Sequence, residues 1–146
     1  MASSSARAAI EAAIPHRDPF LFVTDVIDRG EATLTTEWQV PADMDVFRGH
    51  FPGNPVLPGV LISEHVFQSA AILIYESEAH TQDLPGTPVL TRIQDARFKR
   101  MVKPGETLRT EVTITDSLSN ARFGKAKVRC EGQTVATLNF ALAVTP

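Results

Sequence analysis

The residues in this chain best suited to chemistry are a histidine in a rigid loop and a carboxylate in the apolar run that follows it. His50 lies in the segment RGHFPGNPVLPG (48–59), whose prolines and glycines exclude a regular element before about Pro58. Glu64 lies in a run of mostly apolar and small residues from Gly59 to Ile74. A helix that is apolar all round is a buried one, so the sequence predicts a carboxylate on a core helix.

Such a pair is suited to moving protons. An imidazole titrates near neutral pH and serves as a general base, whereas a carboxyl group among apolar side chains tends to keep its proton and can donate it. Unpaired N–H groups at a helix start stabilise a negative oxygen. Taken alone, His50 could simply satisfy carbonyl groups of its loop. A purely structural role is harder to defend for Glu64, because a buried carboxylate is costly unless it is paired, protonated or functional.

Length and composition indicate one domain over residues 1–146, with 43% hydrophobic and 21% charged residues. The net charge of −3 argues against a dedicated nucleic-acid binder. Glu64, His65 and Gln68 interrupt the apolar run, which favours a core helix over a membrane span. Cys130 stands alone, so a disulfide framework within the chain is excluded and a cytoplasmic location is expected. Residues 1–13 lack a signal-peptide core and predict a flexible tip followed by a short helix, roughly Ala6 to Ala13.

Alternating apolar and polar residues predict about six strands. The expected strands are Phe20–Asp28, Ala32–Val40, Val89–Lys99, one centred on Leu108–Thr115, one on Lys125–Cys130, and a last one burying Ala136 to Val144. The segment from His80 to Pro88 is expected to be a connecting loop. Because most strands come late and are linked by hairpins, the fold class is α+β with an antiparallel sheet. That sheet should wrap the one long apolar helix.

Several motifs resemble the (3R)-hydroxyacyl-acyl carrier protein dehydratases of bacterial-type fatty acid synthesis. They are Pro15-His16-Arg17-x-Pro19-Phe20, Gly49-His50-Phe51-Pro52-Gly53-x-Pro55-x-x-Pro58-Gly59-Val60-Leu61-x-x-Glu64-x-x-x-Gln68, Ala96-Arg97-Phe98-Lys99-Arg100 and Pro104-Gly105. This resemblance implies a hot-dog fold, in which a curved antiparallel sheet wraps a long helix and two protomers pair, with a trimer of such dimers as a larger possibility. It also implies reversible loss of water from a 3-hydroxyacyl thioester, without a metal or organic cofactor.

The resemblance further implies which residues act. His50 and Glu64 would be the catalytic pair, contributed across the dimer interface, and the amide of Gly59 would hold the thioester carbonyl. The residues expected to bind substrate are Gly59, Gln68, Phe51 and Val60. The residues expected to dock the acidic carrier protein are Arg97, Lys99, Arg100 and Lys103. A solvated strand face is the default interpretation of that basic run, although such a patch also steers acidic partners.

Other interpretations stay open. Gln68 is expected to orient Glu64 from one turn away, although a plain core hydrogen bond fits about as well. His16 is expected to stabilise a turn. His65, Phe67 and Arg92 depart from the smaller or less polar residues usual in the family, which predicts a restricted or redirected acyl tunnel. A hot-dog thioesterase and a non-catalytic acyl-binding protein are the alternative functions. Acyl chain length and the choice between carrier protein and coenzyme A are left open by the sequence.

Overall fold

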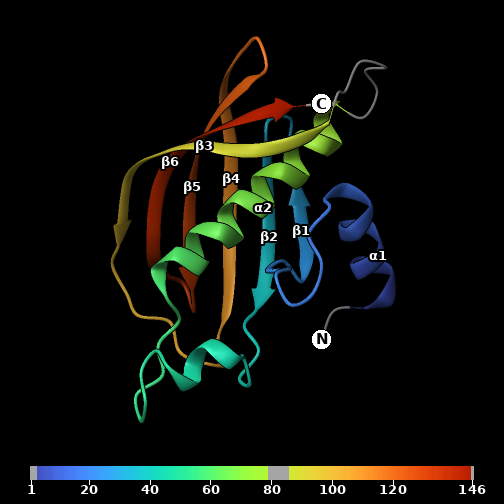
Figure 1. Ribbon diagram of the computed structural model, residues 1–146. Helices are drawn as coiled ribbons and strands as arrows, with labels where there is room; N and C mark the ends of the chain where they lie inside the picture. The colour runs from blue at the N-terminus through green and yellow to red at the C-terminus, as the bar shows by residue number, and fades with distance from the viewer. Residues whose placement is uncertain (1–2, 79–85, 146) are drawn as a thin grey trace.

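The fold is one curved sheet around one long helix, with a second helix at its side (Figure 1). The structure is a computed structural model that describes residues 3–78 and 86–145. Its elements are α1 (Ser4–Ala13), β1 (Asp25–Arg29), β2 (Thr33–Gln39), the 3-10 helix η1 (Asp45–Arg48), α2 (Gly59–Glu78), β3 (Thr87–Phe98), β4 (Thr107–Leu118), β5 (Ala121–Cys130) and β6 (Gln133–Thr145).

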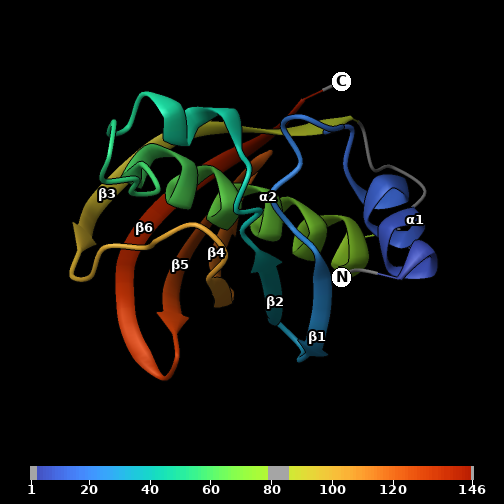
Figure 2. The same ribbon diagram turned by 90° about the horizontal axis from the view of Figure 1, so that it is seen from below.

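The six strands form one antiparallel sheet in the order β1-β2-β4-β5-β6-β3. Figures 1 and 2 show the sheet curving around α2, with α1 beside β1 at the edge far from β3. The predicted alternation is confirmed along β2, over residues 107–112 of β4 and over residues 124–130 of β5, where every second residue is buried. Strand β3 follows α2 in sequence but pairs with the last strand, β6, so it forms an outer edge of the sheet.

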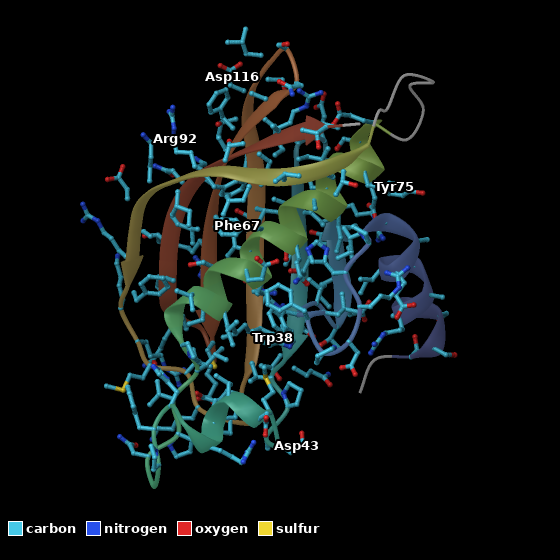
Figure 3. The ribbon with its side chains drawn as sticks, in the orientation of Figure 1. Trp38, Asp43, Phe67, Tyr75, Arg92 and Asp116 are labelled. Carbon is cyan, nitrogen blue, oxygen red and sulfur yellow. The ribbon has the colours of Figure 1, made fainter. Side chains whose placement is uncertain are left out.

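Helix α2 is buried over most of its length, as its apolar sequence predicts. Inside the curve, the ring of Phe67 packs edge-on against Phe140 of β6, with ring centroids 5.8 Å apart. Phe140 in turn lies over Gly124 of β5, where an added Cβ would come within 2.6 Å of the ring. Figure 3 shows Phe67 pointing from α2 toward the sheet. A residue without a side chain on β5 therefore makes room for the two aromatic rings.

The first strand differs from its prediction. A strand was expected from Phe20, yet β1 begins only at Asp25. The backbone of Phe22 is extended but bonds to α2: its N–H donates to Gln68 Oε1 at 2.7 Å, and its carbonyl accepts from His65 Nδ1 at 2.7 Å. Side chains of the helix thus replace a strand neighbour for this segment.

The helix ends also differ from expectation. Helix α1 starts at Ser4 because the Ser3 side chain accepts from the N–H of Ala6 at 3.1 Å, an N-cap that begins the helix two residues early. Helix α2 runs to Glu78, beyond the expected apolar run, where Glu76 pairs with Arg29 at 2.7 Å. Most of the expected loop from His80 to Pro88 lies outside the described residues. No helix in the described part of the chain is long and apolar enough to cross a membrane.

Candidate functional site

The loop that carries His50 leaves one nitrogen of its ring available. Nδ1 lies 2.8 Å from the carbonyl oxygen of Val56, and the backbone of the two residues is joined by a second bond of 2.9 Å from the Val56 N–H to the His50 carbonyl. A carbonyl oxygen only accepts, so Nδ1 must carry the hydrogen. Nε2 is then the nitrogen with the free lone pair. The ring stacks on Phe51, with centroids 4.0 Å apart.

Helix α2 begins at the end of this loop with two unpaired donors. The N–H groups of Gly59 and Val60 make no hydrogen bond to any described residue, as expected for a first helical turn. The ring of Phe98 from β3 lies over Gly59, 3.2 Å from where a Cβ would stand. Val60 is 76% exposed. The apolar side chains of Phe98 and Val60 therefore flank the start of α2.

Glu64 lies one turn further along α2 and is held by Gln68. The amide of Gln68 donates to Glu64 Oε2 at 3.1 Å and to the carbonyl of Phe20 at 3.0 Å. Gln68 itself is fully buried, whereas the Glu64 side chain is 24% exposed. Gln68 therefore makes core hydrogen bonds and also contacts the Glu64 carboxyl group, and its role as an orienting residue stays a prediction.

His16 is the residue whose position sequence reasoning missed. It was expected to stabilise a turn, but its Nε2 lies 3.5 Å from Glu64 Oε2. Its Nδ1 is buried and has no hydrogen-bond partner among the described residues. The signal that could have found it was its place in the Pro15-His16-Arg17 motif.

Within the described residues, the protomer does not bring His50 into hydrogen-bonding or ion-pair contact with Glu64. The base candidate and the acid candidate belong to the same loop-helix segment but have separate partners. Whether the two side chains act in one reaction, and the roles of both residues, stay predictions.

The three departures from the family pattern lie in different surroundings. His65 is fully buried between Phe22 and Thr110, with its Nε2 2.8 Å from the Thr110 hydroxyl. Burial lowers the pKa of His65 to about 4. Phe67 fills the space between α2 and β6, whereas Arg92 is exposed and extends away from β3 (Figure 3). Arg92 is therefore far less suited than Phe67 to restrict an acyl chain inside the protomer.

The expected docking residues divide into two groups. Arg97, Lys99 and Lys103 are exposed. Arg100 is instead held by Glu106, with Nη2 2.9 Å from Oε2, and its side chain is 24% exposed. That hydrogen bond raises the pKa of Arg100, and Cys130 lies buried beside the pair. Arg100 thus stabilises the turn between β3 and β4 within its own protomer.

Outside these residues, no cluster of three His, Cys, Asp or Glu side chains that could hold a metal ion occurs in the described ranges. The groups whose chemistry suits the predicted reaction are the imidazole of His50, the carboxyl of Glu64 and the amides at the start of α2. This set can take a proton, give a proton and bind an oxygen.

Comparison with solved structures supports the fold. The chain superposes on the dehydratase heterocomplex ApeI:P from Xenorhabdus doucetiae with a TM-score of 0.80 and 14% identity, covering 94% of this chain and 91% of the other. It superposes on the PaaI protein of E. coli with a TM-score of 0.66 and 16% identity, covering 95% and 89%. At these identities the likeness shows the fold alone, and the predicted hot-dog fold is confirmed.

Sequence comparison shows the family. The FabA-like domain profile matches residues 14–139. The 3-hydroxyacyl-(acyl-carrier-protein) dehydratase FabZ of Chloroflexus aggregans is 37% identical over 137 residues, covering 93% of each chain. The FabZ of Granulibacter bethesdensis is 41% identical over 134 residues, covering 90% of this chain and 77% of its own length. The chain therefore belongs to the FabA-like family, among the dehydratases of the FabZ type.

Proposed function

We propose that this protein removes water from 3-hydroxyacyl chains carried as thioesters on acyl carrier protein, giving trans-2-enoyl thioesters for fatty acid or related acyl-chain synthesis. The observation that carries the proposal is that only one of the two carboxyl oxygens of Glu64 has a hydrogen-bond partner among the described residues. Its carboxyl group is anchored through Oε2 by Gln68, while Oε1 has no partner among the described residues. A proton donor fixed on one side and free on the other suits the expulsion of a hydroxyl group.

The proposed reaction uses two proton transfers. His50 Nε2 takes the proton from C2 of the substrate, and the electrons of that C–H bond form the C2–C3 double bond. The bond from C3 to its oxygen breaks, and Glu64 gives that oxygen a proton, so that water leaves. During the step the thioester oxygen gains negative charge, which the N–H of Gly59 stabilises. Phe51 and Val60 are exposed apolar side chains beside these groups, suited to contact the acyl thioester.

One experiment separates this function from its alternatives. The protein is incubated with short and long 3-hydroxyacyl thioesters while enoyl absorbance and free thiol are measured together. A dehydratase raises only the absorbance, a thioesterase releases thiol, and an acyl-binding protein does neither. His50→Ala and Glu64→Gln should each lower turnover by at least about 10²-fold, the lower figure for a positioned acid or base. Native turnover in a folded His50→Ala variant would contradict the assignment.

We further infer that the active unit contains two protomers paired through β3, with a trimer of such dimers as a larger form. The outer edge of β3 has no neighbour in the described protomer, and Val89, Leu90 and Ile93 on it are 47%, 37% and 47% exposed. A long apolar edge strand left open is an aggregation site, so a second copy is its natural cover.

Mixed dimers test this pairing. When inactive His50→Ala and Glu64→Gln protomers are combined, one site of the heterodimer has an intact base facing an intact acid from the other chain. Activity should return to a fraction of the native value. If residues of one chain formed each site, both sites would still carry one defect and no activity would return. A stable, active monomer in light scattering would also refute the pairing.

We propose that the acidic carrier protein docks on the basic outer face near the end of β3. Arg97 is in register with Thr137 of β6, which is in register with Lys127 of β5, so cations flank a polar strand. Adjacent strands are about 4.8 Å apart, which puts these cations roughly 10 Å from each other. Lys99 and Lys103 extend the surface, whereas Arg100 contributes little because Glu106 holds it.

Charge reversal tests the docking surface. Lys99→Glu with Lys127→Glu should weaken turnover of carrier-bound substrate, most strongly at low salt, where screening is least. A small thioester mimic should be turned over nearly as before. Arg7→Glu on α1 is the matched control, and equal losses on both substrates would contradict docking.

A cytoplasmic location is proposed with this function, since the buried thiol of Cys130 suits a reducing compartment.

A further inference from the structure

The carboxyl group of Glu64 is held at only one of its two oxygens. Oε2 accepts from Gln68 Nε2 at 3.1 Å and lies 3.5 Å from His16 Nε2, whereas no described residue bonds to Oε1. The orientation of the Gln68 amide is fixed independently, because its own oxygen accepts from the N–H of Phe22 at 2.7 Å. Its NH₂ group must therefore face Glu64.

His16 is brought to this oxygen by a well-anchored segment. The neighbouring Arg17 side chain donates to the carbonyls of Ile14 at 2.9 Å and Glu11 at 3.0 Å, which fixes the backbone on both sides of the turn. The His16 ring lies nearly parallel to the ring of Phe20, with centroids 6.5 Å apart. A histidine that only stabilised the turn would bond to the turn, yet its Nδ1 has no partner in the described part of the chain.

An anchoring contact with Glu64 would require hydrogen on Nε2 of His16. Oε2 acts as an acceptor whether Glu64 is ionised or holds its proton on Oε1. A hydrogen bond at this contact therefore has His16 Nε2 as its donor, and the tautomer with hydrogen on Nε2 leaves Nδ1 without hydrogen. An unprotonated Nδ1 is also the less costly form for a buried nitrogen that lacks an acceptor.

We propose that His16 is a positioning residue for Glu64: with Gln68 it anchors Oε2, so that Oε1 is the oxygen that delivers the proton to the leaving hydroxyl. The inference rests on the proposed function. The 3.5 Å separation is long for a hydrogen bond, and such contacts commonly shorten when substrate binds.

The proposal predicts at which step of the reaction the contacts of His16 and Gln68 with Oε2 matter most. As Oε1 loses its proton, the carboxyl group becomes a carboxylate, and donors to Oε2 bind a charged acceptor more strongly than a neutral one. The His16 contact and the Gln68 hydrogen bond therefore strengthen in the transition state more than in the ground state. Losing such a bond lowers kcat and leaves KM nearly unchanged.

Two amide substitutions at the same position test the proposal. The amide nitrogen of Gln can reach the place of Nε2, whereas that of Asn lies near the place of Nδ1. His16→Asn should lower kcat roughly tenfold or more, with little change in KM, and His16→Gln should recover most of that loss. Arg7→Gln, on the exposed face of α1, is the control and should have native kinetics. Equal kinetics for His16→Asn and the native protein would overturn the proposal.

A measurement on the native protein covers the case in which the variants fail to fold. Nitrogen-15 NMR of the histidine rings should show His16 with hydrogen on Nε2, and its signals should move in Glu64→Gln. The Nδ1–H form would overturn the proposal. If Glu64→Gln were fully active, the proposed function itself would fail; if Glu64→Gln were inactive while His16→Asn were native-like, only the role of His16 would fail.

Discussion

The buried imidazole of His65 predicts that the protein loses stability in mildly acidic solution. The ring is fully buried on α2, and its two nitrogens are used by the Phe22 carbonyl at 2.7 Å and the Thr110 hydroxyl at 2.8 Å. Desolvation lowers the pKa of His65 from 6.5 to about 4, because the charged ring loses more hydration than the bond to Phe22 returns.

The sign and size of the effect follow from proton binding. Between pH 6.5 and about 4, the unfolded chain binds a proton at His65 and the folded chain does not. The contribution of His65 to stability is therefore fully present above pH 6.5 and is lost as the pH falls toward 4. The whole shift corresponds to about 3 kcal/mol, and about 2 kcal/mol of it is lost between pH 7 and pH 5.

Urea unfolding at pH 7 and pH 5 measures this loss, at one protein concentration because assembly also changes apparent stability. His65→Asn is the matched variant, since its amide can still donate to the Phe22 carbonyl but cannot titrate. Carboxylates titrate in both proteins, so the difference between them isolates the imidazole. The native protein should lose about 2 kcal/mol more than the variant on acidification. Equal losses would refute the reasoning.

Two further predictions concern the aromatic packing inside the sheet. Phe67→Ala removes the ring that packs on Phe140, which should lower the free energy of unfolding by about 3–5 kcal/mol in urea titrations. If that space continues the acyl tunnel, the variant should also turn over longer chains, and an unchanged chain-length profile would place the ring in the core only. Gly124→Ala puts a methyl group 2.6 Å from Phe140 and 2.8 Å from the Thr113 carbonyl oxygen, so it should destabilise by about 1–3 kcal/mol. Gly49→Ala, which meets nothing within 4 Å, should unfold like the native protein, and similar midpoints for all three would contradict the packing argument.

Much of the fold could be predicted because burial imposes a period on sequence. Leu108 and Val112 alternate with exposed residues on β4, and only a half-buried strand satisfies that pattern. The apolar run of α2 predicts a helix that is buried on all sides, and the sheet is the element that can surround it. The segment around Phe22 was misjudged as a strand because its composition is strand-like, while its hydrogen-bond partners are side chains 43 and 46 positions away. The hydrophobic periodicity of a short segment cannot reveal hydrogen-bond partners that lie so far away in the sequence.

The candidate site likewise has residues that local sequence reveals and residues that only distant contacts reveal. His50 and Glu64 stood out because an imidazole between glycines and prolines, and a carboxylate in an apolar helix, are each unusual in their own surroundings. His16 and Phe20 did not, since their importance comes from where the N-terminal segment crosses α2. Likewise, Arg100 looked like its basic neighbours in sequence until Glu106 was found opposite it.

The contacts around Glu64 bear on the proposed pairing of two protomers. Gln68, His65 and Phe22 tie the N-terminal segment to the helix, and that segment presents His16 to the carboxylate. All of these bonds lie within one chain. Among the described residues, the ring of His50, by contrast, contacts only its own loop. If the proposed site forms across two protomers, changes to the buried network should impair the acid of their own protomer, whereas changes to the loop should impair the base of the partner's site.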